Sequence, residues 1–109
     1  MSEIEVRIYQ RADGRRPFDE WLESLTDAIA VRRITARLTR VRAGNFGDCK
    51  AVGSGVLELR IDHGPGYRVY MGRHGQTLVL LLCGGDKRKQ SRDILTARNY
   101  WHDWQTHSG

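Results

Sequence analysis

Two arginines and a tyrosine in the second half of the chain have the residue types and spacing needed for chemistry on a phosphodiester. Residues 57–61 and 67–71 each alternate apolar with polar side chains, which predicts two strands joined by a glycine–proline–glycine turn. Because successive strand side chains point to opposite faces, burial of the apolar set predicts that Arg60, Arg68 and Tyr70 lie together on the other face.

RNA cleavage requires no cofactor when the ribose 2′-hydroxyl attacks the adjacent phosphate, provided that the protein orients the attack and stabilises the developing charge. Arg60 and Arg68 are candidates to clamp the phosphate, because arginine binds phosphate oxygens bidentately. Tyr70 is a candidate to bind a base or relay a proton. Lys87, just beyond the following strand, is a candidate to neutralise the leaving oxygen. The same spacing also fits an ordinary solvated surface whose arginines pair with acidic neighbours.

The charge of the chain favours an anionic partner such as nucleic acid or an acidic protein. Eighteen basic residues against 13 acidic ones give a net charge of +5, and all but three of the basic residues are arginine. No acidic residue lies between Ile29 and Gly47, where five arginines project from a predicted helix. The candidate RNA-binding residues are Arg32, Arg33, Arg37, Arg40, Lys50, His63 and Lys89. A solvated turn histidine is the open alternative for His63.

The elements that must position these residues follow from periodicity and caps. We expect a strand over 4–9, a helix over 17–25, and a second helix that Asp27 caps and Gly44 ends. Its buried stripe is predicted to be Ala30, Ile34, Leu38 and Val41. The two helices are expected to form a hairpin.

The second half of the chain is predicted to complete the sheet. After the two alternating strands, the apolar run 77–83 predicts a central strand that Gly84 and Gly85 end. Asp86 is then expected to cap a final helix, whose apolar face is Ile94, Ala97, Trp101 and Trp104. The chain is thus predicted to be one α+β domain, residues 1–109, with a mostly antiparallel small sheet and the order βααβββα.

Several classes of protein are disfavoured by the sequence. The first residues lack the features of a signal peptide, and no apolar run reaches membrane-spanning length, so a cytoplasmic protein is expected. The four histidines and two cysteines lack metal-ligand spacing, so neither metal nor cofactor is predicted. Cys49 and Cys83 are expected to be free thiols.

Two long segments, Gly55 to Tyr70 and Leu80 to Lys87, resemble the signature of the HigB-like addiction-module killer, or phage Gp49-like, branch of the RelE/ParE toxin superfamily. The resemblance extends to Arg16–Leu22 and Ala97–Trp101, so it covers nearly the whole chain in order. It implies a RelE-like fold and a type II toxin–antitoxin operon with a HigA-like helix-turn-helix antitoxin. It also implies ribosome-dependent mRNA cleavage, with Arg60, Arg68 and Lys87 inside the signature.

Two other functions are also compatible with the sequence. A ParE-like toxin shares the fold but acts on DNA gyrase without cleaving RNA, and it needs no phosphate clamp on the sheet. A basic RNA-binding or ribosome-binding module would keep the charge without any catalysis. For the nuclease, Arg68→Ala is expected to relieve the toxicity while leaving the fold intact.

Overall fold

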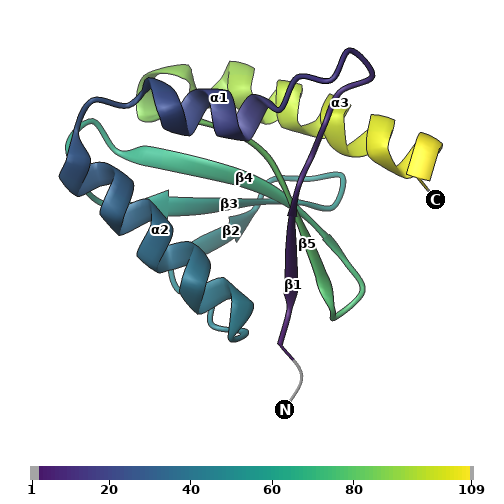
Figure 1. The fold of residues 1–109 in the computed structure, drawn as a ribbon, viewed down its shortest axis with the longest axis horizontal. Helices are drawn as coiled ribbons and strands as arrows, with labels where there is room; N and C mark the ends of the chain where they lie inside the picture. Colours follow the sequence, from purple (N-terminus) through teal and green to yellow (C-terminus); the bar gives the residue numbers. More distant parts are fainter. Residues whose placement is uncertain (1–2, 109) are drawn as a thin grey trace.

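A five-stranded mixed sheet forms the centre of the computed structural model, which describes residues 3–108. The strand order is β1-β5-β4-β3-β2 (Figure 1). The strands are β1 (Glu5–Ile8), β2 (Cys49–Ala51), β3 (Val56–Ile61), β4 (Tyr67–His74) and β5 (Leu78–Asp86). β1 runs parallel to β5, and the other neighbours are antiparallel. The α+β class and the mostly antiparallel sheet agree with the prediction, whereas the short edge strand β2 was missed.

Helices cover both faces of the sheet (Figure 1). α1 (Pro17–Ser24) and α2 (Ala28–Arg42) lie on one face, where Phe18 and Ile34 share a buried cluster with Leu59 and Val69. α3 (Gln90–Ser108) follows the short 3-10 helix η1 (Lys87–Lys89) and lies on the other face. There Trp101 packs in a second cluster with residues of β3, β4 and β5. The sheet therefore has a hydrophobic core on each side.

The first two helices do not form the predicted hairpin. α1 lies over β5, and Figure 1 shows α1 and α2 diverging from their short connection. Each helix instead buries its own apolar side against the sheet, where both contribute to the same core cluster. Asp27 caps α2 by accepting hydrogen bonds from the amides of Ile29 and Ala30. The predicted stripe is confirmed, since the buried residues of α2 are Ala30, Ile34, Leu38 and Val41.

The prediction that Gly84 and Gly85 end the central strand was wrong. β5 continues to Asp86 and pairs Gly85 with Arg68 and Gly84 with Val69. These glycines are required for packing, because a Cβ on Gly84 would lie 2.1 Å from the Trp21 ring. Gly72 on β4 has the same constraint, since its Cβ would lie 2.1 Å from the ring of Trp101. Two tryptophans on opposite faces thus approach the sheet at glycine positions.

We expect Gly72→Ala to lower the free energy of unfolding by about 3 kcal/mol, the upper part of the range for overpacking. The added methyl group collides with the Trp101 ring, which the surrounding core holds in place. Urea unfolding followed by tryptophan fluorescence measures the change. The control is Gly75→Ala, whose new Cβ would meet no atom within 4 Å and which carries only the cost of its positive φ, about 1 kcal/mol. Equal losses in the two variants would contradict the proposed tight packing.

Candidate active site

The register of β3 and β4 brings the predicted arginines to the same place. Arg60 lies directly opposite Arg68, and the next pair on this face is Glu58 opposite Tyr70. The alternate residues of β3 point the other way: Leu59 and Ile61 belong to the cluster beneath α1 and α2, and Leu57 packs against it. The alternation in the sequence therefore sorted the side chains to the correct faces.

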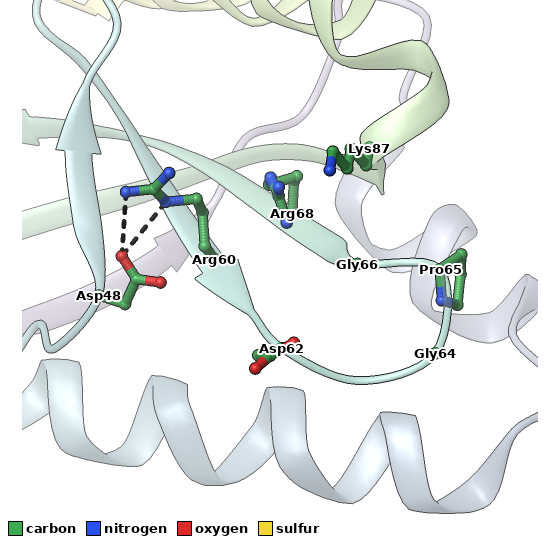
Figure 2. A pocket seen from close by; sticks show the side chains of 8 residues that line it. All are labelled: Asp48, Arg60, Asp62, Gly64, Pro65, Gly66, Arg68 and Lys87. Carbon is green, nitrogen blue, oxygen red and sulfur yellow. Dashed lines mark hydrogen bonds and ion pairs between the residues drawn. The ribbon is translucent and has the colours of Figure 1, made fainter.

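A pocket of about 460 Å³ opens at the end of this strand pair (Figure 2). Its cationic side chains are Arg60, Arg68 and Lys87, and its carboxylates are Asp48 and Asp62. The turn between β3 and β4 forms the rim with Gly64, Pro65 and Gly66. The three cationic residues that the sequence predicted for phosphate chemistry thus line one cavity, although they come from three different elements.

Lys87 joins the pocket through the backbone. Its amide donates a 2.9 Å hydrogen bond to the carbonyl of Gly66, which ties the start of η1 to the turn between β3 and β4. The side chain is exposed, and Figure 2 shows it on the same side of the pocket as Arg68. Asp86, the residue before it, caps η1 by accepting a hydrogen bond from the Arg88 amide.

Arg60 is held at the pocket by Asp48. The Arg60 side chain donates from Nε to Asp48 Oδ1 at 3.2 Å, and a second guanidinium nitrogen lies 3.2 Å from the same oxygen. The backbone amide of Arg60 also donates to the Asp48 carbonyl. The Arg60 side chain remains 38% exposed, so its guanidinium is accessible to a ligand in the pocket. Asp62, in contrast, takes part in no ion pair among residues 3–108.

Tyr70 does not lie on an open cationic surface, and this part of the prediction was wrong. The residue is fully buried against α3, and its hydroxyl donates a 3.1 Å hydrogen bond to Glu58. Burial, and then the charge of Glu58, raise the pKa of Tyr70 far above its ordinary value. Tyr70 is therefore a neutral core residue, and neither base binding nor proton relay in the pocket is open to it. The sequence could not show that α3 covers this part of the sheet.

Arg68 also has a buried side that the sequence did not reveal. The residue is only 9% exposed, and its Nε lies 3.9 Å from Oε1 of the fully buried Glu58. Replacing Arg68 with alanine would leave this carboxylate buried without its cationic partner, which destabilises proteins strongly. The expectation that Arg68→Ala leaves the fold intact is corrected accordingly. Arg60 and Lys87 are better probes of the pocket, because their side chains are more exposed.

The remaining cationic candidates fall into two groups. The exposed ones are Arg32, Arg33, Arg40, Lys50 and Lys89. Arg37 instead donates hydrogen bonds to the carbonyls of Arg60, Phe46 and Asp48, so it fixes the loop that leads to β2 and has fewer donors left for RNA. Arg33, Arg37 and Arg40 line a second hollow of about 270 Å³, which shares Asp62 with the pocket. The cationic face of α2 therefore borders the site.

His63 is directed away from the pocket. Its Nε2 lies 2.9 Å from Oδ2 of Asp27, the cap of α2, and its ring stacks on Tyr67. The side chain is 21% exposed, so His63 connects the turn between β3 and β4 to the start of α2. A direct contact with RNA through this imidazole is thus disfavoured by the structure.

Thiol and metal chemistry have little support in the described part of the chain. Both cysteines are free, and burial raises the pKa of the Cys83 thiol to about 12 and that of Cys49 above its ordinary value. Neither thiol is thus activated as a nucleophile. Within residues 3–108, no cluster of three or more His, Cys, Asp or Glu side chains is arranged to hold a metal ion. No helix in that range is both long enough and apolar enough to span a bilayer.

Comparison with known proteins finds a close relative. A protein of Haemophilus influenzae, described as an uncharacterized protein, is 52% identical to this chain over 81 residues. The aligned part is 74% of this chain and 82% of the relative. No protein-family model matches the chain. No solved structure matches it significantly.

The Asp27–His63 pair makes a prediction about pH. The hydrogen bond from His63, followed by the amide of Ala30, lowers the pKa of Asp27 below its ordinary value of 3.8. A lowered carboxylate pKa stabilises the fold above the ordinary value, and this stabilisation is lost as the pH falls through the lowered pKa. We expect Asp27→Ala to reduce the free energy of unfolding at neutral pH, and the difference from wild type to shrink below pH 3.8. Urea unfolding across the acid range measures it.

The control is Asp13→Ala, which removes an exposed carboxylate that caps no helix. Its loss of stability at neutral pH is expected to be smaller. A difference between wild type and Asp27→Ala that stays constant down to strongly acidic pH would show that the Asp27–His63 contact does not form in solution.

Proposed function

We propose that this chain, which belongs to the same family as the uncharacterized protein of Haemophilus influenzae, is the toxin of a type II toxin–antitoxin pair that cleaves mRNA on the ribosome. The observation that carries the proposal is the convergence of Arg60, Arg68 and Lys87 around one pocket. The resemblance of the sequence to RelE/ParE toxins supports it, as does the α+β architecture, for which we propose a RelE-like fold.

The pocket is suited to a single phosphodiester. Arg60 and Arg68 lie opposite each other on neighbouring strands, so their guanidinium groups can bind the two non-bridging oxygens and the charge that builds on them in the transition state. In the proposed reaction the 2′-oxygen forms a bond to phosphorus while the bond to the 5′-oxygen breaks. The products are a 2′,3′-cyclic phosphate and a free 5′-hydroxyl.

Two groups are available for the accompanying proton transfers. Asp62 lines the pocket without a partner among the described ion pairs, so we assign it as the acceptor of the 2′-hydroxyl proton. Lys87 lies on the side formed by η1, and its ammonium group donates the proton that turns the leaving 5′-oxygen into the 5′-hydroxyl. Tyr70 has no part in this scheme, because it is buried under α3.

The surroundings of the pocket support the choice of a large anionic substrate. The exposed arginines of α2 border the site through the hollow that shares Asp62, so a nucleic acid bound in the pocket would continue across them. The net charge of +5 also suits an antitoxin with an acidic binding segment, which we propose to be a HigA-like helix-turn-helix protein. With this partner, the proposed place of action is the bacterial cytoplasm.

We expect Arg60→Ala and Lys87→Ala each to lower the rate of mRNA cleavage on programmed ribosomes by about 10²-fold. This is the loss typical of removing one group that stabilises transition-state charge. Induction of the wild-type chain in bacteria should stop growth, with new 5′ ends of mRNA clustered in reading frame. Both variants should relieve the arrest while unfolding at nearly the wild-type urea concentration, since both side chains are partly or fully exposed.

The matched control is Arg7→Ala on β1, which removes the same charge from the far end of the sheet and is expected to stay toxic. Intact mRNA together with an early DNA-damage response would contradict the nuclease and favour a gyrase toxin. Ribosome binding without any cleavage would leave a binding module with no catalytic function.

A further inference from the structure

A fully buried carboxylate lies directly behind the pocket. Glu58 is 0% exposed, although it lies on the same face as Arg60 and Arg68, two residues before Arg60 on β3. Taking a carboxylate out of water costs several kcal/mol unless charged or hydrogen-bonding partners compensate for it. A neutral, apolar residue at this position would avoid that cost. The contacts of the Glu58 carboxylate must therefore compensate for its burial.

One oxygen of Glu58 is held by two donors. The Tyr70 hydroxyl donates to Oε2 at 3.1 Å, and the Gln90 amide donates to the same oxygen at 2.8 Å. These donors come from β4 and from the first residue of α3, so they fix the carboxylate from two elements. Neither of these donors bonds to the other oxygen, Oε1.

The other oxygen faces Arg68. Oε1 of Glu58 and Nε of Arg68 are both buried, both without a hydrogen bond among the described residues, and 3.9 Å apart. That distance is about 1 Å longer than a normal N–H···O hydrogen bond, so a small movement would join them. On its other side, the Arg68 guanidinium donates from Nη1 to the carbonyl of Tyr67. The remaining Nη2 is left for a ligand in the pocket.

The same carboxylate is linked to Lys87. Gln90, whose side chain donates to Glu58, follows Lys87 by one turn of helix. The backbone N–H of Gln90 donates to the Lys87 carbonyl. One buried group thus contacts Arg68 directly and reaches the start of η1 through Gln90. At the pocket itself, the Lys87 amide bonds to the Gly66 carbonyl.

We propose that Glu58 is a positioning residue that sets the Arg68 guanidinium for binding a phosphate group in the pocket. The proposal deepens the function proposed above, because it concerns the same site, but it concerns anion binding and is testable without RNA cleavage. Glu58 touches no substrate in this scheme; it acts through Arg68.

Whether removal of the Glu58 charge strengthens or weakens phosphate binding separates positioning from simple electrostatics. Removing a negative charge beside a cationic pocket strengthens anion binding if charge alone matters. If Glu58 positions Arg68, the same removal weakens binding. The probe is inorganic phosphate, titrated into the full chain at constant ionic strength and followed through the Nε–Hε NMR signal of Arg68. We expect Glu58→Gln to weaken phosphate binding about 10-fold, which corresponds to the loss of one charge-assisted hydrogen bond between Arg68 and phosphate.

The matched control is Asp62→Asn, which also replaces a carboxylate with an amide at the pocket. Asp62 is exposed and has no contact with Arg68 among the described hydrogen bonds and ion pairs, so this variant is expected to bind phosphate more tightly. Opposite signs for the two substitutions would support positioning. Tighter binding in both would overturn the proposal.

A second variant covers the case in which Glu58→Gln does not fold. Gln90→Met keeps the length of the half-buried Gln90 side chain but removes one of the two donors that orient Glu58, and we expect a smaller weakening in the same direction. In an Arg68→Lys background, Gln90→Met should have no further effect, because the guanidinium that Glu58 positions is gone. An undiminished effect there would also overturn the proposal.

The failure of this proposal is distinguishable from that of the nuclease. A wild-type chain that binds phosphate but cleaves no mRNA, with Glu58→Gln or Gln90→Met binding more weakly, would remove the nuclease and keep the positioning role. Cleavage by wild type with unchanged phosphate binding in both variants would keep the nuclease and remove the role of Glu58. A wild-type chain that binds no phosphate would overturn the positioning role.

Discussion

In the antiparallel register of β3 and β4, Arg60 lies opposite Arg68 and Glu58 lies opposite Tyr70. A shift of either strand by one residue would turn its two polar side chains toward α1 and α2 and move its apolar residues out of that core. The same register therefore builds the first hydrophobic cluster, the cationic pair and the buried carboxylate. Whatever the pocket binds, its geometry depends on this one strand pairing.

The face that carries these groups is divided into a covered part and an open part. α3 lies over the strands where Tyr70 and Trp101 pack, and the pocket opens only beyond them, at the turn between β3 and β4. Arg68 spans the boundary, with one side toward Glu58 and the other toward the pocket. A cation held in this way is better oriented for a ligand than one on an open surface, because less of its freedom is lost on binding.

The contacts around the pocket join elements that are distant in sequence. Arg37 of α2 binds the carbonyls of Phe46, Asp48 and Arg60, and Asp48 in turn holds the Arg60 side chain. His63 connects the rim of the pocket to the cap of α2. Arginine and histidine thus serve here as structural ties as well as sources of charge, which explains why a count of basic residues overstates the surface available to an anionic partner.

The sequence alone determined which strand residues face the same way and where α1 and α2 begin, because alternation in strands, Pro17 at a helix start and the cap at Asp27 are local properties of the backbone. It therefore predicted the β3–β4 pair, the buried stripe of α2, and Arg60, Arg68 and Lys87 as the candidate phosphate-binding residues. It could not predict the strand β2, the continuation of β5 through Gly84 and Gly85, or the burial of Tyr70 and Glu58. Only the tertiary structure decided these, because each depends on which distant element packs against the strand: α3 over Glu58, and Trp21 against Gly84.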